Sequence, residues 1–213
     1  MTPSFKLFYA PGTCALAPHI ALEEAGVPFE AVRVDTAGGA QRQPEYLALN
    51  PKGRVPLLVV DGQALLTETP AILAYIAQRF PAARLAPLDD PLRFAQAQSF
   101  NSYLCSTVHV AHAHGPRGAR WADDPAAIAA MKRKVPQTMG DCFALIEGTV
   151  LGDGPWVLGA EYSMCDPYLF TMCQWLAADG VDVAGFPKVQ AHVQRMAERP
   201  AVQRALARER ATV

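Results

Sequence analysis

The sequence predicts an α/β domain followed by an all-helical domain. Three observations support this division. Strands and helices alternate over residues 1–80, three prolines fall within residues 81–91, and the segments that follow read as helices. Because proline cannot continue a helix, residues 81–91 are expected to form a linker. We therefore expect an α/β domain over residues 1–80 and an all-helical domain over residues 92–213.

The first domain is expected to contain a mixed sheet. Short apolar runs predict three strands, at residues 5–9, 29–34 and 55–60. The Asp61-Gly62 pair is a strong hairpin turn, so residues 63–66 are expected to return antiparallel. Helices are expected at residues 14–25 and 68–80, with a short helix near residues 44–47 inside an irregular loop over residues 36–50.

The second domain is expected to contain helices only, at about residues 92–113, 125–150, 163–180, 186–198 and 200–210. Pro136 falls inside the second of these and predicts a kink. Ser163 and Asp166 stand three residues apart at the start of the third, which fits a capping box. We assign this pair a structural role.

Composition excludes several classes of protein. The 213 residues are 51% hydrophobic and 18% charged, with a net charge of -1 and no basic patch for nucleic acid. No apolar stretch approaches a membrane span, and Met1–Ser4 lacks the start of a signal peptide. The five cysteines have no framework spacing and are expected to be free thiols. We expect a cytoplasmic protein with no nucleic-acid or membrane partner.

Cys14 is the first candidate for chemistry. It follows the 5–9 strand and a turn, and it opens the predicted 14–25 helix. A helix N-terminus favours thiolate over thiol through its dipole and its unpaired N–H groups. The alternative is a small buried residue at the end of a strand. No Cys-x-x-Cys pair exists, so Cys14 has no local resolving cysteine, which argues against a two-cysteine disulfide reductase.

Two further motifs suggest a binding site for a peptide-like molecule. A cis proline at Val55-Pro56 would turn the backbone of Val55 outward, free to pair with an extended peptide, although a plain proline at the start of a strand explains it too. Glu68-Thr69 lies at the start of a predicted helix. The carboxylate of Glu68 can bind an amine, and the N–H groups of the helix start, with the Thr69 hydroxyl, can bind a carboxylate. The alternative is capping of that helix by Thr67, with Glu68 complementing the dipole.

His109 is the fourth candidate. Ser102, Ser106 and His109 have i, i+4, i+7 spacing, which places them on one helix face and predicts a polar wall of a cleft. His109, His112 and His114 also raise the possibility of a metal site. No carboxylate lies nearby in sequence and Gly115-Pro116 ends the helix, so we expect no metal.

Together these signals carry a family resemblance. Seven motifs spread from about Lys6 to Arg210 contribute: Lys6–Tyr9, Pro11–Cys14, Asn50–Pro56, Leu66–Glu68, Ala71–Ile72, Ser163–Phe170 and Arg195–Pro200. In this combination the chain resembles the glutathione S-transferases, and the bacterial beta class most closely. The resemblance implies a thioredoxin-like N-terminal domain that binds glutathione, a helical C-terminal domain that forms the electrophile site, and a homodimer.

The resemblance also implies roles for individual residues. Cys14 and His109 would flank the glutathione sulfur, while Tyr9, on the strand ahead of the turn, is expected to pack. The implied glutathione contacts are Thr13, Cys14, Val55, Pro56, Glu68, Thr69, Ser102, Ser106 and His109. The electrophile is expected between Pro11, His109, Ala113 and Trp175. Glutathione is the expected co-substrate, and no metal is expected.

The chain departs from the family pattern at several positions. Thr69 stands where serine is usual, Pro70 removes an N–H donor, and Ser102 aligns with the usual asparagine, one residue after Asn101. The usual loop lysine is absent, with Gln41 or Arg42 as replacements. Three functions remain open: conjugation of glutathione to small electrophiles, glutathione-dependent thiol oxidoreduction or reductive dehalogenation, and non-catalytic binding.

Overall fold

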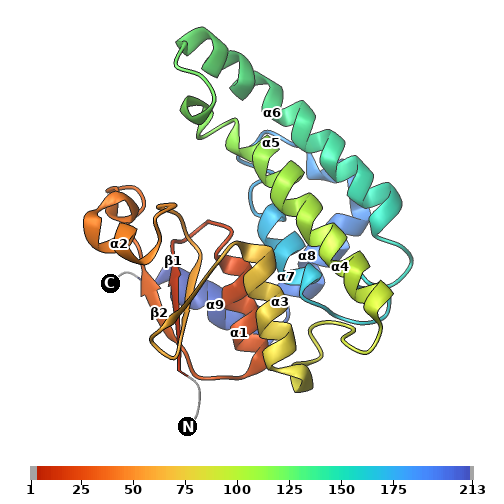
Figure 1. The fold of residues 1–213 in the computed structure, drawn as a ribbon. Coiled ribbons are helices and arrows are strands. Elements are labelled where there is room, and N and C mark those ends of the chain that lie inside the picture. The colour runs from red at the N-terminus through yellow and green to blue at the C-terminus, as the bar shows by residue number, and fades with distance from the viewer. Residues whose placement is uncertain (1–3, 212–213) are drawn as a thin grey trace.

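The computed structural model describes residues 4–211 as two domains (Figure 1). The first domain is built on a four-stranded sheet of β1 (Phe5–Tyr9), β2 (Glu30–Arg33), β3 (Leu57–Val60) and β4 (Ala64–Thr67). The strand order is β2-β1-β3-β4, with β1 parallel to β2 and the other pairs antiparallel. The predicted mixed sheet and its hairpin are confirmed.

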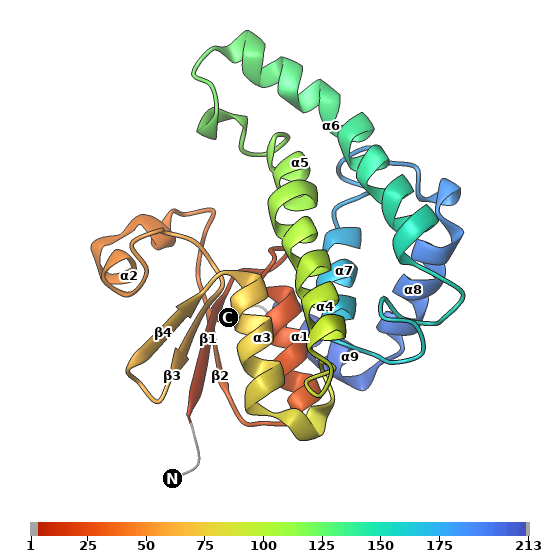
Figure 2. The same ribbon diagram turned by 45° about the vertical axis from the view of Figure 1, so that its right-hand side comes forward.

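Two helices cover one face of this sheet. Helices α1 (Leu16–Ala25) and α3 (Thr69–Arg79) lie together beside it, whereas α2 (Pro44–Leu49) stands apart, beyond the strands (Figure 2). Gly26 ends α1 with a φ of 65°, and its N–H donates to the carbonyl oxygen of Glu23 at 3.2 Å. A left-handed residue at this position suits glycine, which explains the sharp stop of α1.

The second domain is helical, as expected. Its helices are α4 (Pro91–Tyr103), α5 (His109–Ala113), α6 (Pro125–Leu145), α7 (Cys165–Cys173), α8 (Pro187–Ala197) and α9 (Pro200–Arg210). Shorter 3-10 turns occupy Ala40–Arg42, Pro81–Ala83, Gly118–Arg120 and Val183–Gly185, and π-helical turns occupy Leu104–Val108 and Ile146–Val150. Helix α4 begins where the carboxylate of Asp90 accepts from the N–H groups of Leu92 and Arg93, both at 3.0 Å.

The predicted helix boundaries need three corrections. The 92–113 helix is α4 and α5 joined by a π-helical turn. The 163–180 helix is too long, because α7 ends at Cys173 and turns follow. The 125–150 helix is α6 followed by the π-helical turn Ile146–Val150; α6 runs through Pro136, where the kink stays a prediction. A π-turn keeps backbone hydrogen bonds in an otherwise helical run, so residue patterns do not distinguish it from an α-helix.

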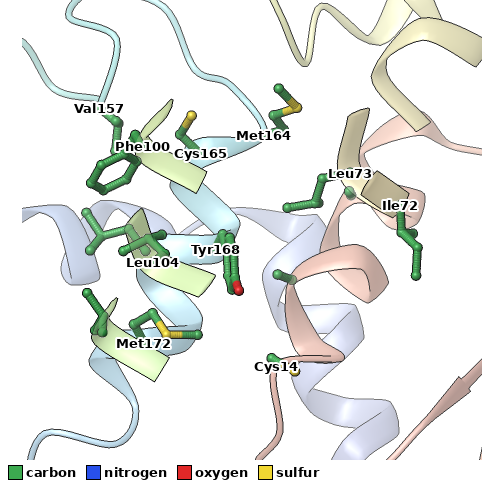
Figure 3. Packing of buried hydrophobic residues seen from close by; sticks show 14 of the residues in the cluster. Cys14, Ile72, Leu73, Phe100, Leu104, Val157, Met164, Cys165, Tyr168 and Met172 are labelled. Carbon is green, nitrogen blue, oxygen red and sulfur yellow. The ribbon is translucent and has the colours of Figure 1, made fainter. Parts of the chain in front are cut away.

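One hydrophobic core joins the two domains. Helix α1 packs against α3 on one side and against α7 and α9 on the other. Leu73 of α3 and Leu104 and Tyr168 of the helical domain belong to the same buried cluster as Cys14 (Figure 3). Ion pairs add to this contact, since Glu24 of α1 lies 2.6 Å from the guanidinium of Arg199. The position of Cys14 relative to the helical domain is therefore set by packing.

The capping box at the start of α7 is confirmed. The N–H of Ser163 donates to the Asp166 carboxylate at 2.7 Å, and the Ser163 hydroxyl accepts from the N–H of Cys165 at 3.2 Å. The other carboxylate oxygen of Asp166 lies 3.0 Å from Nε2 of His192 and 2.9 Å from the N–H of Val157. Because Asp166 and His192 are fully buried, this network is structural, as predicted.

Two predictions concern a signal peptide and a membrane span. We expected no signal-peptide start at Met1–Ser4, and residues 1–3 of that segment lie outside the described residues. Within residues 4–211, no helix has both the length and the apolar character that a membrane crossing requires.

Candidate active site

Two cavities meet at Cys14, between the domains. They share Cys14, Arg54, Val55, His109, Ala113 and Arg120. The Glu68 cavity adds Asn50, Lys52, Pro56, Thr67, Glu68, Thr69, Cys105 and Tyr168. The Trp175 cavity adds Gly12, Thr13, Thr36, Gln41, Gly53, His112, Arg117 and Trp175. The structure thus brings the thiol, the Val55-Pro56 backbone, the Glu68-Thr69 corner and His109 into one region.

Cys14 sits just before α1 rather than inside it. The residue that caps α1 is Ala15, and the Thr13 hydroxyl holds the turn by donating to the carbonyl of Ala10 at 2.7 Å. The thiol is 8% exposed, and Sγ lies 3.8 Å from the carbonyl oxygen of Val55.

The charge state of Cys14 differs from the expectation. Burial raises the pKa of the Cys14 thiol to about 11, while interaction with the Thr69 side chain lowers it by a smaller amount. The prediction of a thiolate favoured by the helix dipole is therefore wrong. Loss of hydration outweighs the dipole, because the thiol is enclosed by the core and α1 begins two residues later.

The Val55-Pro56 peptide bond is cis, and Pro56 is buried one residue before β3. The alternative of an ordinary proline at the start of a strand is therefore wrong. Both residues line the Glu68 cavity, and the carbonyl of Val55 faces the Cys14 thiol. A stretch of backbone thus forms part of the wall next to the sulfur of Cys14.

Glu68 occupies the turn between β4 and α3. Its φ is 71°, in the left-handed region, and its carboxylate lies 2.6 Å from Nζ of Lys52. The same Nζ donates to the hydroxyl of Thr67 at 2.8 Å. The alternative of Thr67 as the helix cap is wrong, because Glu68 takes that position and makes no side-chain capping bond. Thr69, 4% exposed, is the first residue of α3.

His109 lines both cavities from the helical domain. Its ring lies 4.9 Å from the ring of Trp175, whose indole N–H donates to the carbonyl of Gly12 at 2.9 Å. Burial lowers the pKa of His109 to about 4, and electrostatic interaction with His112, Arg117, Arg120 and Arg54 acts in the same direction. The imidazole is consequently neutral at neutral pH.

Some predicted site residues lie elsewhere. Ser102 and Ser106 are exposed and line neither cavity, and the Ser106 hydroxyl donates to the carbonyl of Ser102 at 2.8 Å. The π-turn Leu104–Val108 changes the angular spacing along this helix, so His109 leaves the face that α-helical spacing assigns to the serines. Pro11 also lines neither cavity, although its neighbour Gly12 does.

His112 of α5 and His114, the next residue after α5, have different neighbours. Nδ1 of His112 lies 2.9 Å from the Asp179 carboxylate, and the ring stacks on Trp175 at 4.1 Å. His114 packs against Trp121 instead, at 4.5 Å. In the part of the chain that the structure describes, no three His, Cys, Asp or Glu side chains are grouped to hold a metal ion.

Several cavity residues were missed in the sequence. Cys105, half-buried, lines the Glu68 cavity with Cys14, and the side chain of Tyr168 interacts with it. Figure 3 shows Tyr168 between the helical domain and Cys14, with its hydroxyl oxygen toward the Cys14 end. Arg117 and Arg120 line the Trp175 cavity. No local pattern marks these residues, because folding brings them to Cys14 from distant segments.

Comparison with known proteins identifies the family. Residues 3–78 match the glutathione S-transferase N-terminal domain, and residues 119–209 match its C-terminal domain. Glutathione S-transferase GstA of Escherichia coli O157:H7 is 35% identical over 206 residues, which cover 96% of this chain and 98% of that protein.

Solved structures agree with this assignment. A glutathione transferase homologue from Sulfitobacter, crystallised with glutathione, is 46% identical with a TM-score of 0.93, covering 98% of this chain and 99% of its own. The beta-class enzyme of Sphingomonas chungbukensis is 38% identical with a TM-score of 0.84, covering 96% and 98%. The chain therefore belongs to the glutathione S-transferase family and has its thioredoxin-like and helical domains.

Proposed function

We propose that this protein binds glutathione in the Glu68 cavity and conjugates its sulfur to small hydrophobic electrophiles. The observation that carries the proposal is the meeting of Cys14, the Val55 backbone, the Glu68-Thr69 corner and His109 around one cavity. Glutathione has an amine, two carboxylates and an extended peptide backbone. Its binding site therefore needs charged groups and a free stretch of protein backbone in the same cavity as the site for its sulfur.

Each group has a place in the proposed complex. The glutamyl amine pairs with the Glu68 carboxylate, which Lys52 contacts in the structure. The glutamyl carboxylate lies at the N-terminus of α3, where Thr69 offers a hydroxyl and Pro70 offers no N–H. The peptide pairs with Val55, and the sulfur lies beside Cys14 and His109. Ser102 and Ser106 are exposed and line neither cavity, so the proposed complex includes no contact with them.

The charge states suggest how the thiolate of glutathione is stabilised. Cys14, with a pKa of about 11, remains a thiol at neutral pH, and its S–H turns from the Val55 carbonyl to the glutathione sulfur when glutathione binds. His109, with a pKa of about 4, is neutral and donates a ring N–H. Two donors facing one sulfur stabilise its anion, which then attacks the electrophile.

Calorimetric titration with reduced glutathione tests the binding. We expect one molecule per chain with a dissociation constant between about 1 µM and 1 mM. Glu68→Gln is expected to weaken binding about tenfold or more, because it removes the charge opposite the amine. Glu30→Gln is the matched control: Glu30, on β2, pairs with Lys6 on β1, and its replacement should leave the affinity for glutathione unchanged. No binding, or equal affinities for both variants, would overturn the proposal.

Thiol–disulfide exchange is the second candidate function, and reductive dehalogenation is its alternative among glutathione-dependent reductions. The observation that favours it is Cys105, a second thiol that lines the same cavity as Cys14. In such an exchange a Cys14 thiolate attacks a disulfide, one thiolate leaves, and glutathione then attacks the mixed disulfide to release Cys14 and form a new disulfide. A protein that binds glutathione and catalyses neither reaction would be the non-catalytic binding protein.

We also propose that the protein is a cytoplasmic homodimer. The family resemblance carries the dimer, and exposed apolar side chains are consistent with it: Leu92 on α4 is 69% exposed and Leu65 on β4 is 43% exposed. Sedimentation equilibrium is expected to give twice the chain mass. A single-chain mass at micromolar concentration would contradict it.

A further inference from the structure

The Trp175 cavity is strongly positive. Arg54, Arg117 and Arg120 line it, and its lining contains no Asp or Glu. Within residues 4–211, none of the three guanidinium groups lies within ion-pair distance of a carboxylate. Three unneutralised cations around one cavity favour an anionic ligand.

Two of these arginines come from a well-defined turn. The N–H of Arg117 donates to the carbonyl of Ala113, and that of Arg120 to the carbonyl of Arg117, both at 2.9 Å. Gly118 lies against α6 so closely that a Cβ there would meet Ile128 at 2.9 Å. This turn follows α5 and projects from the helical domain on the side of α2 in both views (Figures 1 and 2). Packing on α6 thus fixes the backbone of the turn, from which the exposed side chains of both arginines line the cavity.

The positive charges act on one another. Burial lowers the pKa of Arg120, and the nearby charges of Arg117, Arg54 and Arg42 lower it further. Such mutual repulsion is relieved when an anion binds among the guanidinium groups. The cavity therefore has an electrostatic reason to bind a negative group.

Glutathione does not account for all of this charge. Its glycyl carboxylate is a single anion, and Arg54, next to Val55, lies where the peptide of glutathione is proposed to run. Arg120 lines both cavities, whereas Arg117 lines only the Trp175 cavity. Arg117 therefore remains for a second ligand, on the domain opposite Arg54, with Arg120 beside it. His109, Ala113 and Trp175 line the same space and offer aromatic and apolar contact to a carbon skeleton.

We propose that the second substrate is a small electrophile that carries a carboxylate, bound by Arg117 and Arg120 with its reactive carbon toward Cys14 and His109. The proposal rests on the proposed glutathione site. Guanidinium groups match carboxylates in geometry and charge, so they determine which electrophiles bind. With an aryl chloride, the glutathione sulfur forms a bond to the ring carbon, chloride leaves with the bonding electrons, and the thiol proton passes to solvent.

Matched aryl chlorides test this specificity. 4-Chloro-3-nitrobenzoate and 4-chloro-3-nitrobenzamide differ in charge at one position, and each rate is divided by the uncatalysed rate with glutathione. We expect a higher normalised kcat/KM for the benzoate. Arg117→Gln should reduce that preference about fivefold, with little change for the benzamide, and Arg120→Gln should reduce the preference likewise. Arg133→Gln, an exposed arginine of α6 that lines neither cavity, is the control.

Binding measurements separate this proposal from the proposed function. Calorimetry with 3-nitrobenzoate and 3-nitrobenzamide needs no turnover, and the benzoate should bind more tightly by about fivefold or more in the wild type only. If the benzoate and the benzamide bind equally, or if a variant with both Arg117→Gln and Arg120→Gln keeps the preference for the benzoate, the anion site is overturned. If the variants weaken glutathione alone, the arginines serve glutathione and the inference is wrong. Failure of glutathione binding with the anion preference intact would overturn only the proposed function.

Discussion

The thiol of Cys14 lies 3.8 Å from the carbonyl oxygen of Val55, so the sulfur faces a backbone acceptor inside the core. This contact suits a thiol better than a thiolate, because a carbonyl oxygen accepts the S–H proton and repels a negative sulfur. Cys14 is therefore suited to donate a hydrogen bond at neutral pH.

The pKa of about 11 for Cys14 predicts slow alkylation at neutral pH. The rate with iodoacetamide, followed by mass spectrometry of the Cys14 peptide, should rise with pH up to about 11. Since the folded state holds this proton more tightly than the unfolded state, the corresponding stability is present below pH 9 and is lost as pH rises towards 11. A rate that levels off below pH 8 would contradict a raised pKa for this thiol.

His109 should stay neutral across the physiological range. Its pKa of about 4 predicts that its ring protons show no titration in NMR spectra between pH 6 and 8. The folded state resists protonation here, so stability from this group is present above pH 6.5 and declines as pH falls towards 4. His109→Asn should remove the histidine signal that titrates near pH 4, which assigns it to this ring. A midpoint near 6.5 for His109 would contradict its burial.

Replacement of Cys14 should separate the two candidate reactions. With Cys14→Ala, conjugation of 1-chloro-2,4-dinitrobenzene is expected to persist, since glutathione supplies its own thiol and His109 remains as a donor. Exchange with a glutathione mixed disulfide should be abolished, because the attacking sulfur is gone. Cys142→Ala is the control, since this buried cysteine lines neither cavity. Equal loss or equal retention of both activities would contradict this division.

The capping box should be measurable in stability. Ser163→Ala removes the hydroxyl that accepts from the N–H of Cys165 at 3.2 Å, and we expect a loss of about 1 kcal/mol in the free energy of unfolding. Urea denaturation gives this value. Ser99→Ala, at an exposed position of α4, should change it by less than about 0.5 kcal/mol. An unchanged midpoint for Ser163→Ala would mean that another group satisfies the amide.

The order of elements was predictable because it depends on short stretches of chain. Alternating apolar runs, the Asp61-Gly62 turn and the proline-rich linker each act on neighbouring residues, and the structure confirms the mixed sheet and the helical domain. The contact between Ser163 and Asp166 was also predictable, since both belong to one helix start. Cys14, Glu68 and His109 were identified from their places at the ends or faces of such elements.

Tertiary structure decided what surrounds those residues. The thiolate expected at Cys14 is replaced by a buried thiol, because desolvation comes from every neighbouring side chain and not from the helix start alone. The π-turn at Leu104–Val108 alters the helical spacing between His109 and the two serines, Ser102 and Ser106, which line neither cavity. Cys105, from the same turn, lines the Glu68 cavity.

The sequence by itself determined the elements, their order and the side chains available for chemistry. Only the tertiary structure decided which of them share a cavity, which charges are neutralised, and that Arg117 and Arg120 face the same space as Trp175. The physical reason is range: backbone preferences act over a few residues, whereas burial and electrostatics act between any groups that folding brings within about 10 Å.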